Sequence, residues 1–465
     1  MRRLPDADDD CRPAAGAAPL ARGGTRGQVK SKSRFRLAAL WRASPDIRLL
    51  FDRASWTLVD QGVVSLGNFA LNVQLARGLA TSDYGKFALF LGAIFALRCF
   101  DYSLISYPLS VRLCAAPKEE HAGLLANTVL LAVGLGLVLV MVLALGIELL
   151  GGGEILFAGV ACFLCWQIQE TMRRCLLASF RYRAAVAGDA TSFIGQAFLI
   201  AALAWTDSLT LVTALYAMST TLLAGALVHA SKLSFGRASL TEAIALARDY
   251  ASIGKWSLLY NEMLTLRLQL FPWVLAATAG AAATAVFQAA SNISSFMNPV
   301  SLGIGNAIPQ AAAQARLSHG PFGAWRVARG YLVFGLPAIL AICAAGLLAP
   351  QLILRLMYGA SSPYIDAALC VQLLVVAGLT EYIGEMIGKA LLGIGAGRLA
   401  SLVIVLGLAA SVLTVPLIIP LGVLGAALAV TIANVIRLFV AWLALRWLIA
   451  KETAPGALAE SSIPA

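Results

Sequence analysis

Long runs of apolar residues, separated by short polar stretches, fill the chain from about residue 55 to residue 450. A helix that crosses a bilayer needs about 20 consecutive, mostly apolar residues. Such runs lie at 55–76, 84–107, 122–146, 155–177, 184–205 and 209–230, and again at 254–277, 281–306, 327–349, 366–390, 398–418 and 422–447. The pattern therefore predicts an all-α polytopic membrane protein with about twelve transmembrane helices.

The positions of Lys and Arg test this number of spans. Cytoplasmic loops carry an excess of basic residues, and the connections here alternate between basic and nearly neutral. The basic connections hold Arg112 and Lys118; Arg173, Arg174, Arg181 and Arg183; Lys232, Arg237 and Arg248; Arg316 and Arg326; Arg398; and Arg446 and Lys451. The others hold little beyond Arg77, Lys86 and Arg355. We therefore expect an even number of spans with both termini in the cytoplasm.

The two halves resemble each other weakly at an offset of 200 residues, which aligns Trp56 with Trp256 and Leu75 with Leu275. Because each half has an even number of spans, both halves have the same orientation. We therefore expect two six-helix bundles related by a pseudo-two-fold axis along the membrane normal, with a substrate site at their interface. The predicted bundles are 54–230 and 254–450, joined by a cytoplasmic linker at 231–253. A disordered basic tail with an interfacial segment is predicted at 1–53, and a second cytoplasmic tail at 451–465.

Polar side chains form one stripe along the first span and another along the eighth. Each stripe follows helical spacing, so each lies on one face of its helix. Both faces should point into the protein, where they either line a wet lumen or join helices by hydrogen bonds. The stripes comprise Gln61, Ser65, Asn68 and Asn72 in the first span, and Gln288, Asn292, Ser295 and Pro299 in the eighth.

Arg267 lies near the middle of the seventh span. A guanidinium at that depth costs about 2.5–3.5 kcal/mol on insertion scales, so it normally faces a protein interior or a wet cavity. Its partner is either an anionic ligand, whose oxygens fit the planar guanidinium, or a fixed carboxylate elsewhere in the protein. Glu262 of the same helix points about 140° away, at about 100° per residue, and is not expected to pair with it.

Other charged residues lie within the spans. Arg98 and Asp101 stand three residues apart and are predicted to pair with each other. Glu385 and Lys389 stand four apart and should form an ion pair near a helix end. This pairing leaves Glu381 as the buried acid of the tenth span.

Most of these charges fall in the inner half of the predicted spans, which favours a cavity loaded from the cytoplasm. Arg437 lies close enough to the inner end of the last span to snorkel toward water. Carboxylates in a low dielectric exchange protons when their exposure changes, so a proton or sodium ion is a candidate coupling ion. The predicted coupling residues are Asp60, Asp101, Glu262 and Glu381.

The composition agrees with a membrane protein, because 60% of the residues are hydrophobic and 13% are charged. The net charge of +11 gives no nucleic-acid signal, since the basic residues lie in the tail and in alternate loops. The eight cysteines fall in the tail, in spans or at cytoplasmic ends, so disulfides are not expected. Cys162 and Cys165 lie within an apolar helix, where packing outranks redox or metal chemistry. The histidines form no cluster, and no loop is long enough for a catalytic domain, so we expect a transporter without cofactor or metal rather than an enzyme.

Three segments resemble a known family. Residues 66–89 resemble the first-hairpin signature of Wzx-type polysaccharide flippases, which belong to the MOP exporter superfamily together with the MATE antiporters. Residues 286–310 are similar to the eighth-span segment of that family, and residues 390–436 to its last three spans. The resemblance covers roughly residues 55 to 450.

The resemblance implies a V-shaped pair of six-helix bundles in the bacterial inner membrane. Such flippases move undecaprenyl-diphosphate-linked oligosaccharide to the outer leaflet by alternating access, for exopolysaccharide, capsule or O-antigen export. The implied partners are the lipid-linked oligosaccharide, membrane lipid, and polysaccharide polymerase and export proteins. A cationic lumen faces the diphosphate in this family, a role assigned here to Arg267 and Arg98. The candidate substrate-binding set is Arg267, Arg98, Asn68, Asn72, Gln288 and Asn292.

Two other functions remain open. A cation-coupled multidrug exporter of the same superfamily would have a lumen dominated by acids and aromatics, with Arg267 held by a fixed acid such as Glu262 of a neighbouring face or Glu381. A membrane scaffold for a polysaccharide synthase would need no cavity at all. The position of Arg267 relative to an open lumen therefore bears on all three functions.

Overall fold

The structure, a computed structural model, describes residues 45–453, which form helices and turns without any strand. The predicted tails, 1–53 and 451–465, fall mostly outside the described residues, which leave out 1–44 and 454–465. The helices of the first half are α2 (Pro45–Gly78), α3 (Thr81–Asp101), α4 (Tyr107–Ala115), α5 (His121–Leu149), α6 (Leu156–Ala178), α7 (Tyr182–Trp205) and α8 (Leu211–Ala230). Those of the second half are α9 (Leu240–Ser294), α10 (Asn298–Gly305), α11 (Ile308–Leu348), α12 (Pro350–Tyr358), α13 (Ala368–Gly393), α14 (Gly397–Thr414) and α15 (Ile418–Thr453).

Three glycines reverse the chain inside segments of continuous helical hydrogen bonding. Gly280 in α9, Gly320 in α11 and Gly422 in α15 have φ angles of 86°, 65° and 54°. Residues with a Cβ rarely adopt this region, so glycine is the residue that permits these tight turns. By length and composition, eight helical segments of residues 45–453 can cross a membrane, and the longest of them runs from Leu240 to Leu348 through two of these turns.

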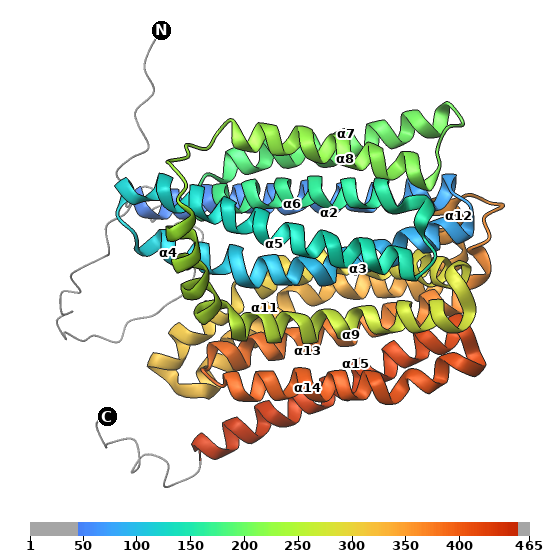
Figure 1. The fold of residues 1–465 in the computed structure, drawn as a ribbon. Helices are drawn as coiled ribbons and strands as arrows, with labels where there is room; N and C mark the ends of the chain where they lie inside the picture. Colours follow the sequence, from blue (N-terminus) through green and yellow to red (C-terminus); the bar gives the residue numbers. More distant parts are fainter. Residues whose placement is uncertain (1–44, 454–465) are drawn as a thin grey trace.

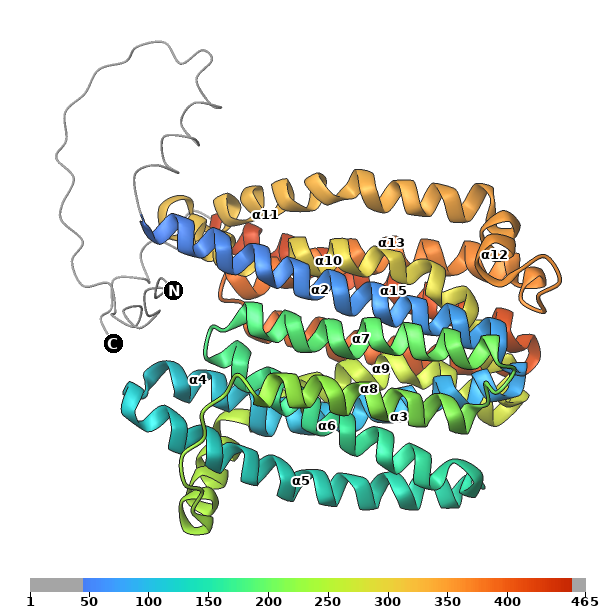
Figure 2. The ribbon, with the colours of Figure 1, turned by 90° about the horizontal axis from the view of Figure 1, so that it is seen from above.

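Divided at the three glycines, the eight segments give eleven helical passes, and α2, which is not among the eight, is the twelfth. The described residues thus make twelve passes, in agreement with the predicted fold class. The passes form two bundles of six, which lie one above the other in Figure 1, and α2 runs along the first bundle beside α7 in Figure 2. We call these bundles the N-terminal lobe and the C-terminal lobe.

Three details differ from the predicted spans. The second span continues past residue 107, because a π-helical segment, Tyr102–Ser106, joins α3 to α4. The eighth span extends to the turn at Gly320. The short helix α12 was not predicted, because its nine residues are too few to cross a bilayer.

The segment predicted as a linker is helical from Leu240 and continuous with the seventh span. Its first part packs against the N-terminal lobe, where the Asn127 side chain on α5 donates to Glu242 at 2.8 Å and accepts from the backbone N–H of Ser239 at 2.8 Å. The rest of α9 belongs to the C-terminal lobe. The boundary between the two lobes therefore lies within a helix rather than in a loop.

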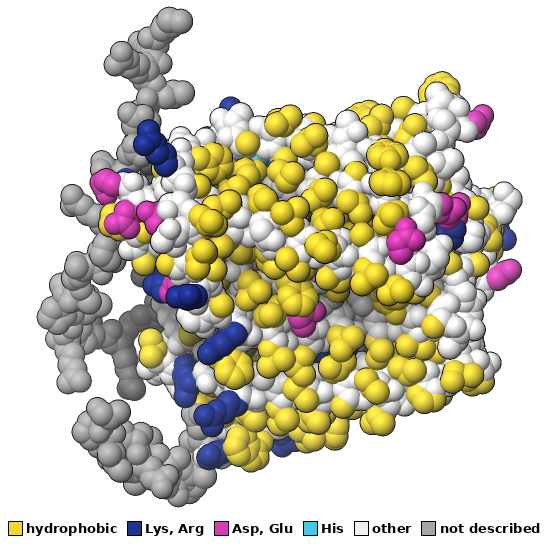
Figure 3. Space-filling view, in the orientation of Figure 1, with side chains coloured by type: hydrophobic (Ala, Val, Ile, Leu, Met, Phe, Trp, Pro, Cys, Tyr) yellow, Lys and Arg dark blue, Asp and Glu magenta, His cyan; other side chains and the backbone are white. Residues whose placement is uncertain are grey.

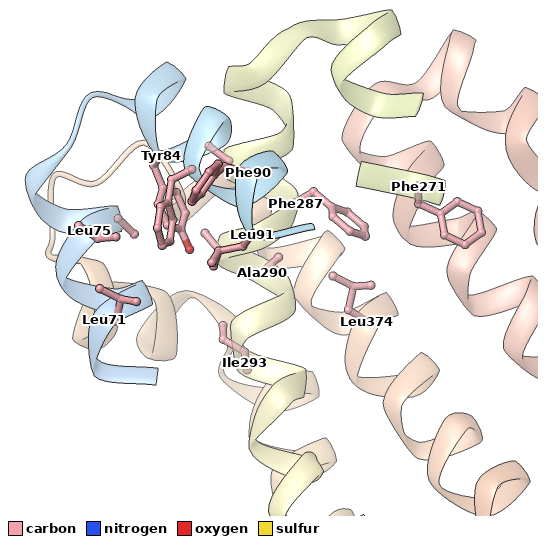
Figure 4. Packing of buried hydrophobic residues seen from close by; sticks show 14 of the residues in the cluster. Leu71, Leu75, Tyr84, Phe90, Leu91, Phe271, Phe287, Ala290, Ile293 and Leu374 are labelled. Carbon is pink, nitrogen blue, oxygen red and sulfur yellow. The ribbon is translucent and has the colours of Figure 1, made fainter. Parts of the chain in front are cut away.

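The lobes meet closely where α3 packs along α9. Gly85 approaches the backbone of Ala281 so closely that an added Cβ would lie 1.8 Å from the carbonyl oxygen. Figure 4 shows that the surrounding hydrophobic core is shared, with Leu75 from α2, Tyr84 from α3, Phe287 from α9 and Leu374 from α13. Close backbone contact at small residues is a common means of joining membrane helices.

Lys and Arg gather at the end of the molecule where α15 ends (Figure 3). The positive-inside rule predicts that this end is cytoplasmic. We call it the inner end and the opposite end the outer end. The intervening surface is largely hydrophobic in Figure 3, as expected for a face in contact with lipid.

Candidate functional site

The C-terminal triad consists of Arg267 on α9, Glu381 on α13 and Arg437 on α15. Both guanidinium groups bind the one carboxylate, with N–O distances of 2.9 Å for Arg267 and 2.8 Å for Arg437. Arg267 also donates to the Asn434 side chain at 2.8 Å. Two arginines share a single acid, so the triad carries a formal charge of +1.

This arrangement bears on two predictions. Of the two partners left open for Arg267, the structure shows the fixed carboxylate, because the side chain is 4% exposed and held by Glu381 and Asn434. Arg437 does not snorkel toward water, since it is 5% exposed and bound to the same acid. Glu381, predicted as the buried acid, keeps 29% of its side chain exposed within the triad. The predicted pair of Glu385 and Lys389 is confirmed at 2.8 Å.

A second charged cluster, the N-terminal network, lies in the other lobe. Its centre is Arg173 on α6, which binds Asp60 of α2 at 2.5 Å and Asp189 of α7 at 2.5 Å. All three side chains are at most 9% exposed. The cluster therefore joins three helices through one buried cation.

The same network extends along α6 to α3. Glu170 binds Arg98 at 2.9 Å and Arg174 at 2.7 Å. The predicted pair of Arg98 and Asp101 is wrong, because Asp101 instead accepts a hydrogen bond from Gln167 at 2.6 Å. Arg98 and Asp101 therefore bind two different side chains of α6, Glu170 and Gln167. We define the N-terminal network as Arg98, Arg173, Arg174, Asp60, Asp101, Glu170 and Asp189.

Sequence reasoning missed Glu170 and Asp189, and it placed Arg173 in a loop. Both acids stand inside apolar spans, and an ionisable residue there is a functional candidate by default. The spacing of Glu170 and Arg174, four residues apart on one helix face, was a further available signal. Neither signal identifies the partners, which come from α2, α3 and α7.

The third group, the outer seal, joins the two lobes near the outer end. Asn292 on α9 donates to the Tyr84 hydroxyl of α3 at 2.9 Å and to the Tyr358 hydroxyl at the end of α12 at 3.2 Å. Tyr84 in turn donates to Asn72 of α2 at 3.3 Å. The Arg77 guanidinium donates to the carbonyls of Leu356, at 2.7 Å, and of Met357, which are among the last carbonyls of α12. A cation is favourable at a helix carboxyl end, where carbonyls lack helical partners.

The polar stripes therefore meet at this seal rather than along an open lumen. Gln288 donates to Asn292 at 3.0 Å, and Asn72 donates to the carbonyl of Asn68 at 2.9 Å. The structure brings Asn72, Gln288 and Asn292 together but separates them from Arg267 and Arg98. Their predicted role in substrate binding stays a prediction.

Glu262 belongs to none of these groups. It lines a hollow of about 400 Å³ between α3 and α9, together with Thr265 and Gln269. The three residues stand three and four positions apart and so share one helix face, which lines the hollow. One carboxylate oxygen of Glu262 is buried without a hydrogen-bond partner in the described part of the chain. Within residues 45–453 no group of three His, Cys, Asp or Glu side chains is placed to hold a metal ion.

Comparison with known proteins places this fold among transporters. An inward-facing multidrug resistance MATE family transporter of the MOP superfamily matches with a TM-score of 0.71 and 18% identity, over 84% of this chain and 96% of that chain. An outward-facing MATE family transporter matches with a TM-score of 0.61 and 18% identity, over 87% and 96%. A MOP superfamily transporter from Pyrococcus furiosus, described as having a binding pocket of reverse polarity, matches with a TM-score of 0.63 and 18% identity, over 88% and 96%. No protein-family model matches the sequence, and no curated protein matches it.

The chain therefore has the fold of MATE family transporters of the MOP superfamily. It is a multi-pass membrane protein whose structural neighbours are transporters rather than enzymes.

Proposed function

We propose that the chain exports undecaprenyl-diphosphate-linked oligosaccharide by alternating access between its two lobes. The observation that carries this proposal is the surplus positive charge of the C-terminal triad. Glu381 compensates one of the two guanidinium groups, and the neighbouring Glu385 is already paired with Lys389. A surplus charge within the bilayer attracts an anion strongly, because the surrounding dielectric is low.

A diphosphate suits this site by its chemistry. Its oxygens accept paired N–H bonds from guanidinium groups, as a carboxylate does. Glu381 keeps part of its side chain exposed, so a diphosphate can approach the arginines from that side and compete with the carboxylate. Arg267 and Arg437 would then hold the diphosphate, and Glu381 would reclaim them on release.

The outer seal supports loading from the inner end. The seal joins α3 to α9 and α2 to α12 across the lobe interface near the outer end, which opposes opening on that side. The proposed cycle begins with the outer end closed, admits the headgroup from the cytoplasm, and ends when the seal separates. Asp60 and Asp101 of the N-terminal network, with Glu262 and Glu381, remain the proposed coupling residues, with a proton or sodium ion as the coupling ion. The bacterial inner membrane, cytoplasmic termini and a division into lobes at 54–230 and 254–450 belong to the same proposal.

Arg437→Gln tests the role of the triad directly. The variant leaves Arg267 paired with Glu381 and so removes the surplus charge without stranding the acid. We expect translocation of fluorescent undecaprenyl-diphosphate-linked sugar in reconstituted vesicles to fall at least tenfold. Arg446→Gln is the matched control, because it makes the same change at an exposed position of α15. Unchanged translocation in Arg437→Gln would remove the triad from the transport site.

The second candidate is a cation-coupled multidrug exporter. It is favoured by the four acids and three arginines of the N-terminal network, which leave that lobe with an excess of acid. This function predicts efflux of a cationic dye from the same vesicles, driven by a proton or sodium gradient, and no movement of the lipid-linked sugar. Transport of neither substrate would favour the scaffold.

A further inference from the structure

The N-terminal lobe contains a cavity at its inner end that the triad and the outer seal do not involve. It has a volume of about 380 Å³, which is within the range of small-ligand sites. Its walls come from α2, α4, α6 and the start of α7. The polar atoms that face it belong mainly to Asp60, Gln61, Ser110 and Arg174.

One of these side chains has unused hydrogen-bonding capacity. Asp60 is 2% exposed, and its carboxylate is held by Arg173 and by a hydrogen bond with Asp189. The amide of Gln61 makes no hydrogen bond within residues 45–453, although it lines the same cavity. A side-chain amide beside a cavity can both donate to and accept from a ligand that binds there.

The charges of the cavity argue against an ionic ligand. Arg173 and Arg174 are both neutralised by acids of the network, with Glu170 bound to Arg174 at 2.7 Å. A phosphate would meet the carboxylate of Asp60, and an organic cation would meet the two guanidinium groups. A neutral ligand with many hydroxyls meets neither obstacle, because each hydroxyl both donates and accepts.

The remaining walls suit the ring of a sugar. Phe180 and Tyr182 lie at the start of α7 with their ring centroids 6.4 Å apart, and both line the cavity. Aromatic faces provide a large rigid apolar surface. Asp60, Gln61, Ser110 and Arg174 supply the mixture of acceptors and donors on the polar side.

We propose that this cavity, which we call the inner cavity, binds a neutral sugar of the transported headgroup. The proposal rests on the proposed function, since it assigns the oligosaccharide to the N-terminal lobe and the diphosphate to the C-terminal triad. The two lobes then recognise different parts of one substrate. Sugar recognition would hold the headgroup at the inner end before the diphosphate reaches the arginines.

Binding measurements in nanodiscs test the proposal. The probes are undecaprenyl diphosphate with one hexose, undecaprenyl diphosphate without sugar, free methyl hexosides and inorganic pyrophosphate. We expect the hexose to tighten binding of the lipid about tenfold. In Gln61→Leu and in Ser110→Val that advantage should fall to about one, with binding of the bare lipid unchanged.

Thr191→Val is the matched control for Ser110→Val. Each hydroxyl donates to the carbonyl four residues earlier, Ser110 to Ser106 at 3.0 Å and Thr191 to Ala187 at 2.9 Å, but Thr191 does not line the cavity. The hexose advantage should persist in this variant.

Several outcomes would overturn the sugar site. These are a hexose advantage of one in the wild type, an advantage that survives Gln61→Leu, or pyrophosphate bound in place of the hexosides. Failure of the proposed function would be a distinct result. In that case Arg437→Gln would change neither the binding of the lipid without sugar nor the rate of transport. If neither lipid binds, saturation-transfer NMR with the methyl hexosides tests the sugar site directly. The absence of a saturation-transfer signal with the wild-type protein would then refute the site.

Discussion

The two lobes both bury arginines against acids, but they balance the charges in opposite ways. In the N-terminal network three arginines face four acids, and Arg173 alone joins residues from two other helices. In the C-terminal triad two arginines share Glu381. The same residue types therefore give one lobe a network with one more acid than arginine and the other lobe a surplus positive charge.

This difference indicates why a charged residue in a span cannot be interpreted alone. A buried ion pair gains little stability over well-packed apolar residues, but removing one partner is severe because it leaves an uncompensated charge. Arg173 binds acids of three helices, Asp60, Glu170 and Asp189, so its role is to hold these helices together. Arg267 and Arg437 compete for one acid, so a further anion could be accommodated beside them.

The largest expected effect comes from breaking the N-terminal network at its centre. Arg173→Leu leaves Asp60 and Asp189 buried without their cation, which should cost about 3–5 kcal/mol. We expect little folded protein, measured as the yield and apparent melting temperature of the purified protein in detergent. Arg112→Leu removes an exposed partner of Asp249 and should change neither quantity. Equal losses in the two variants would contradict a structural role for the network.

The sequence was sufficient to predict the spans, because the length of an apolar run is dictated by the thickness of the bilayer. The predicted runs failed mainly where the chain turns within a helix, as at Gly320, or where a helix is too short to span, as in α12. A glycine in an apolar run does not by itself reveal a turn. Such reversals depend on how the flanking helices pack.

The charged residues of the triad were identifiable, but their partners were not. Arg267 and Glu381 were both singled out, yet they lie 114 positions apart, and only the packing of α9 against α13 brings them together. Arg98 was assigned to Asp101 from helical spacing, while the acid Glu170 of α6 lies closer in space. Spacing along the sequence predicts which residues are neighbours on one helix, but it does not predict contacts between helices.

Weakening the outer seal should have a smaller effect, measured on the distance between the lobes. Any transport role of the two lobes requires that this seal separate. Tyr84→Phe removes the hydroxyl that accepts from Asn292 across the lobe interface and donates to Asn72. The loss of a hydrogen bond of about 1 kcal/mol would raise the outward-open population up to about fivefold. Spin labels at Glu148 and Gln351, exposed positions near the outer ends of α5 and α12, would report the distance between the lobes in a cysteine-depleted background.

Tyr216→Phe on α8 serves as the control for this measurement, since Tyr216 is exposed and lies away from the seal. We expect its distance distribution to match that of the parent protein. A distribution in Tyr84→Phe that also matches the parent would show that the seal does not limit opening at the outer end.

The smallest effect should come from the acid that lies one helical turn from the triad. Glu385→Gln removes a pair with Lys389 whose side chains are 30% and 20% exposed, and such pairs four residues apart contribute about 0.3–0.5 kcal/mol. Glu381→Gln makes the same chemical change but leaves two guanidinium groups without their shared carboxylate. We therefore expect the apparent melting temperature to fall in Glu381→Gln and to stay nearly constant in Glu385→Gln. If the two variants behaved alike, the charge balance of the triad would not distinguish it from an ordinary surface pair, and the contrast between the lobes would lose its energetic basis.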